Sequence, residues 1–260
     1  MALLHVNFFS DVLGMSMNMD VILPQRTKGQ IGMKGNSRGE KYPVLYLLHG
    51  MSDDHTIWQR RTSIERYVSE LGIAVVMPSV HLSFYTDMKY GLNYWTFISQ
   101  ELPTICREFF PNMSDRREDT FVAGLSMGGY GALKLGLRAS DTFGAVACLS
   151  GALDMVASLK GGAISDPSGV FRNIFGSVEE MVDSEEDLMA VAGRLKESGK
   201  PLPKVYIWCG TEDFLYEHNL TAKRRLMELG YDLTYEESAG DHQWCYWDEK
   251  IQRVLEWLPL

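Results

Sequence analysis

The amino-acid sequence predicts an α/β protein built on a mostly parallel, doubly wound sheet that opens with an N-terminal antiparallel hairpin. Two observations indicate this fold class. Short runs of Val, Ile and Leu recur from residue 44 onward without polar alternation, which is typical of strands covered on both faces. Helical patterns separate these runs, and a repeated succession of strand and helix predicts parallel crossover units.

The first 41 residues predict the hairpin and an exposed connection. Apolar and polar residues alternate over 4–8 and 16–23 with the two-residue period of a half-buried strand. A turn around residues 11–14 joins the two stretches. The segment 25–41 is rich in Gly, Lys and Arg and offers little to bury, so we expect it to be exposed.

The remaining elements follow in order. Buried strands are expected at 44–48, 73–77, 120–125, 145–149 and 205–209, with a last strand at 231–236. Helices are expected at 56–71, 94–110, 126–139, 216–229 and 243–257, with a kink or break at Pro103.

The interval 153–200 interrupts this alternation. It contains no clear strand, but it includes an acidic run at 179–187 and a helical pattern at 188–196. Its length is about three times that of an ordinary connection. We therefore expect a single α/β domain over residues 1–260, with a small helical, cap-like insertion at about 153–200 packed over one end of the sheet.

Composition argues against several classes of partner. Hydrophobic residues make up 45% of the 260 residues and charged residues 23%, as in ordinary globular proteins. The net charge of −9 argues against nucleic-acid and anionic-membrane surfaces, which concentrate Lys and Arg. The N-terminus lacks the features of a signal peptide and no run of 18 apolar residues occurs, so we expect a cytoplasmic protein.

The four cysteines predict neither disulfides nor a metal centre. They lie far apart without a C-x-x-C pair, and Cys148 and Cys209 fall within apolar runs. Reduced thiols in the core are the expected state. The neighbouring Asp53, Asp54 and His55 do not meet the ligand requirement of a zinc site, so no metal or other cofactor is predicted.

The stretch Gly124-x-Ser126-x-Gly128 points to a nucleophile because of its context. The pentapeptide alone can arise by chance, but here a predicted strand precedes the serine and a predicted helix follows it. Such a sharp turn requires glycine two residues before and after the serine, because side chains there would collide. A nucleotide-binding glycine turn is the alternative, and it lacks its acidic partner in a second βα unit.

A serine hydroxyl needs a base and an acid to become a nucleophile. In a sheet of this kind the acid and the base follow the serine in that order, each on a loop after a late strand. Of the six histidines, only His242 has this position. Asp213, shortly after the strand 205–209, is the expected acid, whereas Glu212 would point elsewhere and Asp241 lies too close to His242 along the chain.

Two backbone amides are expected to form an oxyanion hole. One is that of Met127, directly after the nucleophile, and the other is that of Met51 in the loop after the strand 44–48. Several aromatic residues flank the predicted site loops and would leave room for a small acyl group, although some of them can equally belong to the core. They are Trp58, Tyr85, Trp95, Phe214 and Trp244.

Taken together, these motifs resemble the esterase D branch of the α/β-hydrolases, which includes the S-formylglutathione hydrolases and, as the most similar members, the bacterial tributyrin esterases. The resemblance rests on four ordered motifs spread along the chain: G-L-S-M-G-G-Y-G-A at 124–132, Y-W at 94–95 followed by Q-E-L-P at 100–103, G-x-x-D-F-L at 210–215 and D-H at 241–242. It implies the same nucleophile, acid, base and oxyanion amides.

The chain also departs from the formylglutathione hydrolases. Those enzymes carry a Cys-containing loop after the third strand and a His after the paired glycines, where this chain has Met51-Ser52 and Tyr130. The departures favour oxygen esters over the glutathione thioester.

A serine carboxylesterase acting on small acetyl to butyryl esters is therefore expected. The resemblance suggests a possible homo-oligomer. A carbohydrate acetyl or feruloyl esterase, a thioesterase, an acyltransferase and a non-catalytic binding protein remain alternatives.

Overall fold

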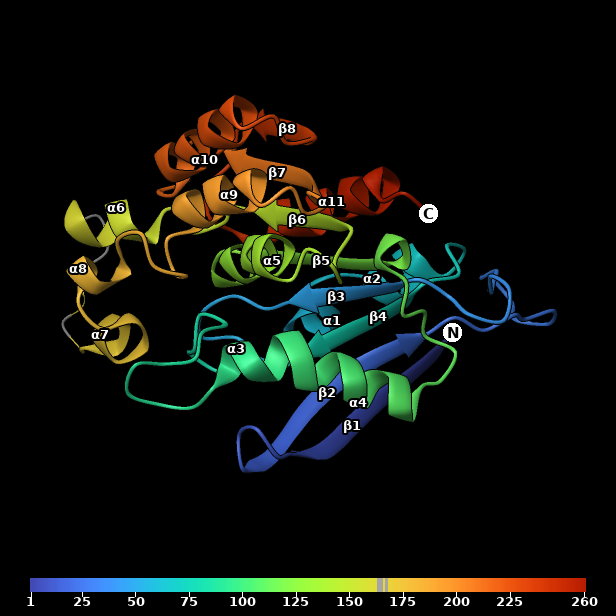
Figure 1. Cartoon of the computed structure of the whole chain (residues 1–260). Helices are drawn as coiled ribbons and strands as arrows, with labels where there is room; N and C mark the ends of the chain where they lie inside the picture. The colour runs from blue at the N-terminus through green and yellow to red at the C-terminus, as the bar shows by residue number, and fades with distance from the viewer. Residues whose placement is uncertain (163–165, 167) are drawn as a thin grey trace.

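The computed structural model describes residues 1–162, 166 and 168–260, and an eight-stranded sheet forms its centre (Figure 1). The strands are β1 Ala2–Ser10, β2 Met15–Leu23, β3 Val44–Leu48, β4 Ala74–Pro78, β5 Thr120–Leu125, β6 Ala145–Leu149, β7 Lys204–Gly210 and β8 Leu233–Ser238. They lie side by side in the order β1-β2-β4-β3-β5-β6-β7-β8. From β3 the chain passes to β4 on one side and then to β5, β6, β7 and β8 on the other, while the hairpin of β1 and β2 lies beyond β4.

Of the eight strands described, β2 alone runs against the others. β1 pairs antiparallel with β2, and β2 pairs antiparallel with β4. Every pair from β4 across to β8 is parallel. The predicted fold class, including the antiparallel hairpin, is confirmed.

Helices cover both faces of the sheet. They are α1 Ile57–Arg61, α2 Ile64–Val68, α3 Tyr94–Thr96, α4 Leu102–Phe109, α5 Met127–Arg138, α6 Met155–Lys160, α7 Val170–Phe175, α8 Val178–Met181, α9 Leu188–Glu197, α10 Tyr216–Glu228 and α11 Trp244–Trp257. One buried cluster joins the sheet to α4, α5, α9 and α10, and another joins it to α1, α2 and α11. Neighbouring strand residues such as Phe121 and Val122 contribute to opposite clusters, because successive side chains of a strand point to opposite faces.

Two predicted helices are interrupted. The helix expected at 56–71 is divided into α1 and α2, and the Thr62 hydroxyl at the break donates to the Trp58 carbonyl. The helix expected at 94–110 contains a π-helical turn, Phe97–Glu101, which ends two residues before Pro103. There the Leu102 N–H bonds to the carbonyl of Phe97, five residues back. Proline has no N–H to continue the regular ladder, which fits the predicted irregularity.

The expected insertion is shorter than 153–200. Figure 1 shows α6, α7 and α8 beyond the carboxyl ends of the strands. By contrast, α9 contacts α5 and α10 and forms part of the helical layer on the sheet, so the helical pattern at 188–196 belongs to an ordinary crossover. Residues 163–165 and 167 of the expected insertion lie outside the described residues.

A buried polar cluster ties the segment between α8 and α9 to the centre of the fold. Lys134 of α5 is fully buried and forms an ion pair with Glu186. The hydroxyl of Tyr130 donates to the same carboxylate at 2.7 Å, and that of Thr86 does so at 2.9 Å. Because a buried ammonium needs such partners, this cluster fixes the start of α9 against α5.

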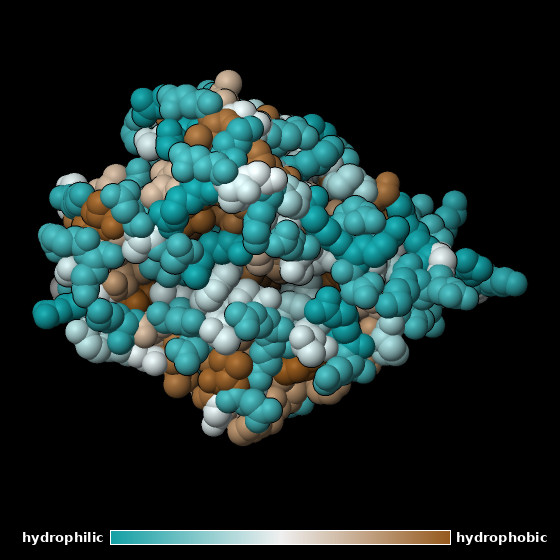
Figure 2. All heavy atoms as spheres, viewed as in Figure 1, coloured by the Kyte–Doolittle hydropathy of each residue, from teal (hydrophilic) through white to brown (hydrophobic). Residues whose placement is uncertain are grey.

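Hydrophilic residues cover most of the face seen in Figure 2, with hydrophobic patches between them. Among the helices described, none has the length and apolar character needed to cross a membrane.

Candidate active site

Ser126 occupies the sharp turn between β5 and α5. Its backbone has φ of 51°, a conformation that non-glycine residues rarely adopt, and its N–H donates to the Leu149 carbonyl of the neighbouring strand. A Cβ atom on Gly124 would lie 2.3 Å from the Gly128 carbonyl oxygen. A Cβ atom on Gly128 would lie 2.6 Å from the Leu48 carbonyl oxygen. The turn therefore requires both glycines, although the clashes would be with backbone atoms, whereas the sequence predicted a clash between two side chains.

His242 lies on the loop between β8 and α11 and contacts Ser126. Its Nε2 atom is 3.0 Å from the Oγ atom of Ser126. Its Nδ1 atom is 2.8 Å and 3.1 Å from the two carboxylate oxygens of Asp213. Because an ionised carboxylate only accepts hydrogen bonds, Nδ1 carries the ring proton and Nε2 is left free to accept the serine proton.

Asp213 is buried and held by several donors. The N–H of Leu215 donates to its Oδ1 atom at 2.9 Å. Burial by itself would raise the pKa of this carboxyl, but the contact with His242, the Leu215 N–H and the Ser150 hydroxyl outweigh burial and lower the pKa. The carboxylate is therefore kept ionised beside the imidazole.

The two other acids weighed for this position do not contact the ring nitrogen. Glu212 accepts the N–H of Gly240, and Asp241 accepts the side-chain amide of Gln243 at 2.7 Å. The structure thus brings together Ser126, Asp213 and His242.

Met51 and Met127 supply unpaired amides at the ends of two adjoining segments. Met127 is the first residue of α5, where a helix has no internal acceptor for its N–H, and Met51 lies in the turn after β3. Within the described residues, neither N–H donates to a protein acceptor. The two segments touch, since a Cβ on Gly128 would lie 2.6 Å from the Leu48 carbonyl oxygen and 2.7 Å from that of His49.

Of the five flanking aromatics, Phe214 is the one that is both exposed and packed against the His242 ring. Phe214 is 64% exposed and its ring centre lies 4.6 Å from that of His242. Trp244 is half-buried and packs edge-on against Trp58 and Trp247.

The expectation that the other three aromatics line an acyl pocket is wrong. Trp58 is buried and donates its indole N–H to the Leu48 carbonyl. Tyr85 is buried as well, and its hydroxyl donates to the His49 carbonyl. Trp95 stacks on Arg138, 4.2 Å away, near the C-terminal end of α5. Sequence position placed these residues near site loops, but it did not reveal which way their side chains point.

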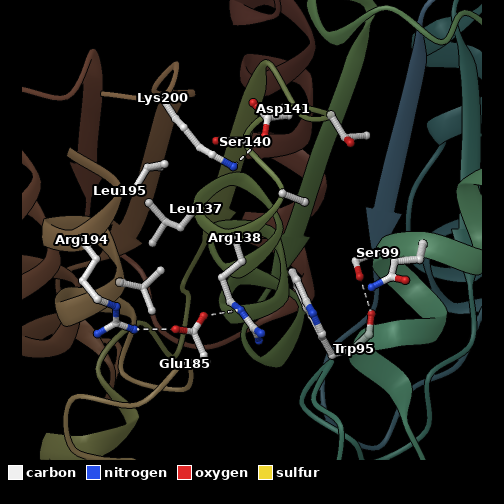
Figure 3. Close-up of a pocket in the computed structure, with 14 residues that line it drawn as sticks. Trp95, Ser99, Leu137, Arg138, Ser140, Asp141, Glu185, Arg194, Leu195 and Lys200 are labelled. Atoms are coloured by element: carbon white, nitrogen blue, oxygen red, sulfur yellow. Dashed lines mark hydrogen bonds and ion pairs between the residues drawn. The ribbon is translucent and has the colours of Figure 1, made fainter. Parts of the chain in front are cut away.

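Trp95 lines a different cavity, of about 510 Å³ (Figure 3). Figure 3 shows Arg138 and Arg194 both directed at Glu185, and Lys200 paired with Asp141. This cavity is not lined by Ser126, Asp213 or His242. Each of the three cations that line it already pairs with an acid, which weakens its attraction for an anion.

Two functional neighbours were missed from the sequence. Trp247 packs edge-on against the His242 ring, with ring centres 4.8 Å apart, and its indole N–H donates to the Ser150 hydroxyl at 3.1 Å. Ser150 is buried and has φ of 47°. A tryptophan on an amphipathic helix looks like a core residue, and the only local signal for Ser150 was its position directly after a predicted strand.

The residues weighed as a metal site do not gather ligands. Within the described part of the chain, no group of three or more His, Cys, Asp or Glu side chains is placed to hold a metal ion. The cysteines are free thiols, three of them buried, while Cys245 is exposed.

Comparison with known proteins decides the family. A family model described as "Putative esterase" matches residues 10–258. The chain belongs to this esterase family. A relative named acetyl esterase, from Caldicellulosiruptor saccharolyticus, is 32% identical over 265 residues, covering 99% of this chain and 98% of the relative.

Solved structures of esterase-like enzymes share the fold. The fluorophosphonate-binding serine hydrolase F of Staphylococcus aureus superposes with a TM-score of 0.87 at 33% identity, covering 99% of this chain and 98% of that one. An S-formylglutathione hydrolase of the same organism gives a TM-score of 0.85 at 34% identity, with the same coverage. The resemblance to the esterase D branch is confirmed, and this esterase is a hydrolase of the serine type with the α/β-hydrolase fold.

Proposed function

We propose that this esterase hydrolyses short-chain acyl oxygen esters, acetyl to butyryl, through an acyl-enzyme on Ser126. The observation that carries the proposal is the continuous contact from Ser126 Oγ to His242 Nε2 and from His242 Nδ1 to Asp213. This arrangement gives a weakly nucleophilic hydroxyl a base of fixed tautomer, and the base an ionised partner.

In the proposed mechanism, Ser126 Oγ attacks the ester carbonyl carbon while His242 Nε2 takes the hydroxyl proton. The carbonyl oxygen becomes an oxyanion that accepts hydrogen bonds from the N–H groups of Met51 and Met127. Collapse of this intermediate breaks the bond to the alcohol, which leaves with the proton from His242. Water then repeats the attack on the acyl carbon, releasing the acid and restoring Ser126.

Preference for a small oxygen ester is supported by the acetyl esterase relative and by the exposed Phe214 beside His242. Tyr130, which differs from the formylglutathione hydrolases, is buried and bonded to Glu186, so it supports the fold rather than the choice of substrate. A thioesterase is therefore the second candidate, favoured by the S-formylglutathione hydrolase neighbour at 34% identity.

Two further alternatives have counterparts among the similar proteins. A ferulic acid esterase superposes with a TM-score of 0.78 at 25% identity. A mycolyltransferase of Mycobacterium gordonae is 28% identical over 267 residues. The cytoplasmic location and the homo-oligomer remain predictions from the sequence.

The test is a panel of p-nitrophenyl acetate, butyrate and octanoate, an acyl thioester and a feruloyl ester, assayed with wild type and Ser126→Ala. We expect the highest kcat/KM for acetate or butyrate and loss of activity in Ser126→Ala. Ser99→Ala, whose hydroxyl bonds to the Trp95 carbonyl at the separate cavity, is the matched control and should keep wild-type rates. A preference for the thioester would favour the second candidate, and an active Ser126→Ala enzyme would refute the mechanism.

A further inference from the structure

The loop after β3 holds one carbonyl group with two donors. The Nδ1 atom of His49 lies 2.7 Å from the carbonyl oxygen of Gly50. The N–H of Asp53 donates to the same oxygen at 3.3 Å. Because a carbonyl oxygen only accepts, His49 carries its proton on Nδ1 and donates it to Gly50.

The orientation of this carbonyl determines where the next amide points. The Gly50–Met51 peptide is trans and planar, so its C=O and N–H bonds point in opposite directions. With the Gly50 oxygen turned toward His49 and Asp53, the N–H of Met51 points to the other side of the peptide. Among the described residues no protein group accepts that N–H.

His49 itself cannot turn away. The N–H of Val80 donates to its Nε2 atom at 3.0 Å, which requires an unprotonated Nε2. The Tyr85 hydroxyl donates to its main-chain carbonyl at 2.8 Å. The ring is buried, and burial lowers its pKa to about 4, which favours a neutral imidazole with one fixed tautomer.

The same residue also touches the nucleophile helix. Its carbonyl oxygen and that of Leu48 lie so close to Gly128 that a Cβ there would come within 2.7 Å of both. His49 thus lies between the turn that carries Met51 and the helix start that carries Met127.

We propose that His49 is a positioning residue for the oxyanion hole, because its Nδ1–H holds the Gly50 carbonyl and thereby aims the Met51 N–H at the developing oxyanion. The inference rests on the proposed function, since it requires that the Met51 amide bind the oxyanion. His49 touches neither the substrate nor Ser126, and it acts through the Gly50–Met51 peptide.

Two substitutions separate this role from a purely structural one. In His49→Asn the side-chain amide nitrogen takes roughly the place of Nδ1, so the donor to Gly50 is kept and the acceptor for Val80 is lost. In His49→Gln the longer side chain reaches roughly the place of Nε2, so an acceptor for Val80 is kept and the donor to Gly50 is lost.

We expect His49→Gln to lower kcat on p-nitrophenyl butyrate by about 10- to 100-fold with little change in KM, somewhat less than removal of an oxyanion donor itself. His49→Asn should stay within about fivefold of wild type. Affinity for a trifluoromethyl ketone, which forms a tetrahedral adduct with the serine, should fall in parallel with kcat in His49→Gln. The reverse order of the two variants, or equal rates in both, would overturn the inference.

Loss of stability is monitored with a matched control. Trp58→Phe removes another buried hydrogen bond at the end of β3, from the indole to the Leu48 carbonyl, and should lower Tm while leaving kcat within about twofold. Rates are expressed per active serine, counted by complete labelling with a fluorophosphonate.

A measurement on the wild-type protein keeps the inference testable if both His49 variants fail to fold. Ring-nitrogen NMR should show His49 protonated on Nδ1 and bare on Nε2 at pH 7, and the opposite tautomer would overturn the inference. Different results would refute the proposed function and the role of His49. An active Ser126→Ala enzyme would refute the mechanism, whereas wild-type kcat in His49→Gln would refute only the role of His49.

Discussion

The Nε2 atom of His242 lies 3.0 Å from the Oγ atom of Ser126, although 116 positions separate the two residues in the chain. The sheet accounts for this contact. β5 ends at the serine and β8 ends shortly before the histidine, and parallel strands bring their carboxyl ends to one edge. Asp213, after β7, completes the arrangement from a third strand of the same edge.

Replacing the acid tests the orientation of the ring. In Asp213→Asn the new amide can donate to Nδ1, which favours the tautomer with its proton on Nε2 and removes the acceptor for the serine proton. We expect kcat to fall on the order of 10⁴, as in the best-known serine protease triad. Steady-state kinetics on p-nitrophenyl butyrate measures the loss.

The matched control for that substitution is Asp241→Asn, since Asp241 adjoins His242 in sequence but bonds to Gln243. It should retain wild-type kcat within about threefold. A loss below tenfold in Asp213→Asn would point to Glu212 or another acid.

Close backbone contact at Gly128 predicts a strong effect of a single methyl group. In Gly128→Ala the added Cβ would lie 2.6 Å from the Leu48 carbonyl oxygen, so the start of α5 must move away from the end of β3. We expect kcat to fall by more than about 100-fold, because the amides of Met51 and Met127 would separate.

Activity and Tm are compared with Gly29→Ala, where the added Cβ meets nothing within 4 Å. This control should behave as wild type. A fully active Gly128→Ala enzyme would contradict the assigned geometry of the oxyanion hole.

Removing the indole N–H of Trp247 tests whether this residue helps to hold Asp213 and His242 in place. Trp247→Phe keeps a ring beside His242 but loses the hydrogen bond to Ser150, whose hydroxyl helps to lower the pKa of Asp213. We expect kcat on p-nitrophenyl butyrate to fall by about 3- to 10-fold because the ring and its carboxylate are held less firmly. An unaltered kcat would show that Trp247 only fills space.

Acid should destabilise the protein partly through His49. Burial lowers its pKa from 6.5 to about 4, so between these values the unfolded chain binds a proton that the folded chain does not. The contribution of His49 to the free energy of unfolding is therefore lost as the pH falls from about 6.5 to 4, by about 3 kcal/mol in total.

Urea unfolding of wild type and His49→Gln at several pH values measures this contribution of His49 to stability. The difference between their free energies of unfolding should shrink toward pH 4, because the variant has no imidazole to protonate. The lowered pKa of Asp213 affects both proteins alike and cancels. A difference that stays constant from pH 7 to pH 4 would contradict the prediction.

Much of the fold could be predicted because buried parallel strands leave a strong sequence pattern. β3, β5 and β6 begin and end where the continuous apolar runs do. The turn at Ser126 was predictable as well, since its two glycines are a steric requirement. Order along the chain then selected His242 and Asp213 from several candidates.

What the sequence did not reveal depends on side-chain direction and on hydrogen bonds to the backbone. Trp58 and Tyr85 lie near the site along the chain but point into the core. The helix at 188–196 looked like part of an insertion because the segment before it is long, yet it packs on α5. His49 acts through a peptide carbonyl, and no residue pattern records such a contact.

The most direct test of the proposed acyl-enzyme is mass spectrometry of the intact protein, quenched in acid within milliseconds to seconds of mixing with excess p-nitrophenyl butyrate. Wild type should carry one added butyryl group, which peptide mapping places on Ser126 and which disappears as the substrate is consumed. Ser126→Ala should carry none, and Asp213→Asn should acquire it slowly. A wild-type enzyme that turns over the ester while no acyl group ever appears on Ser126, or an equal adduct on Ser126→Ala, would contradict the mechanism.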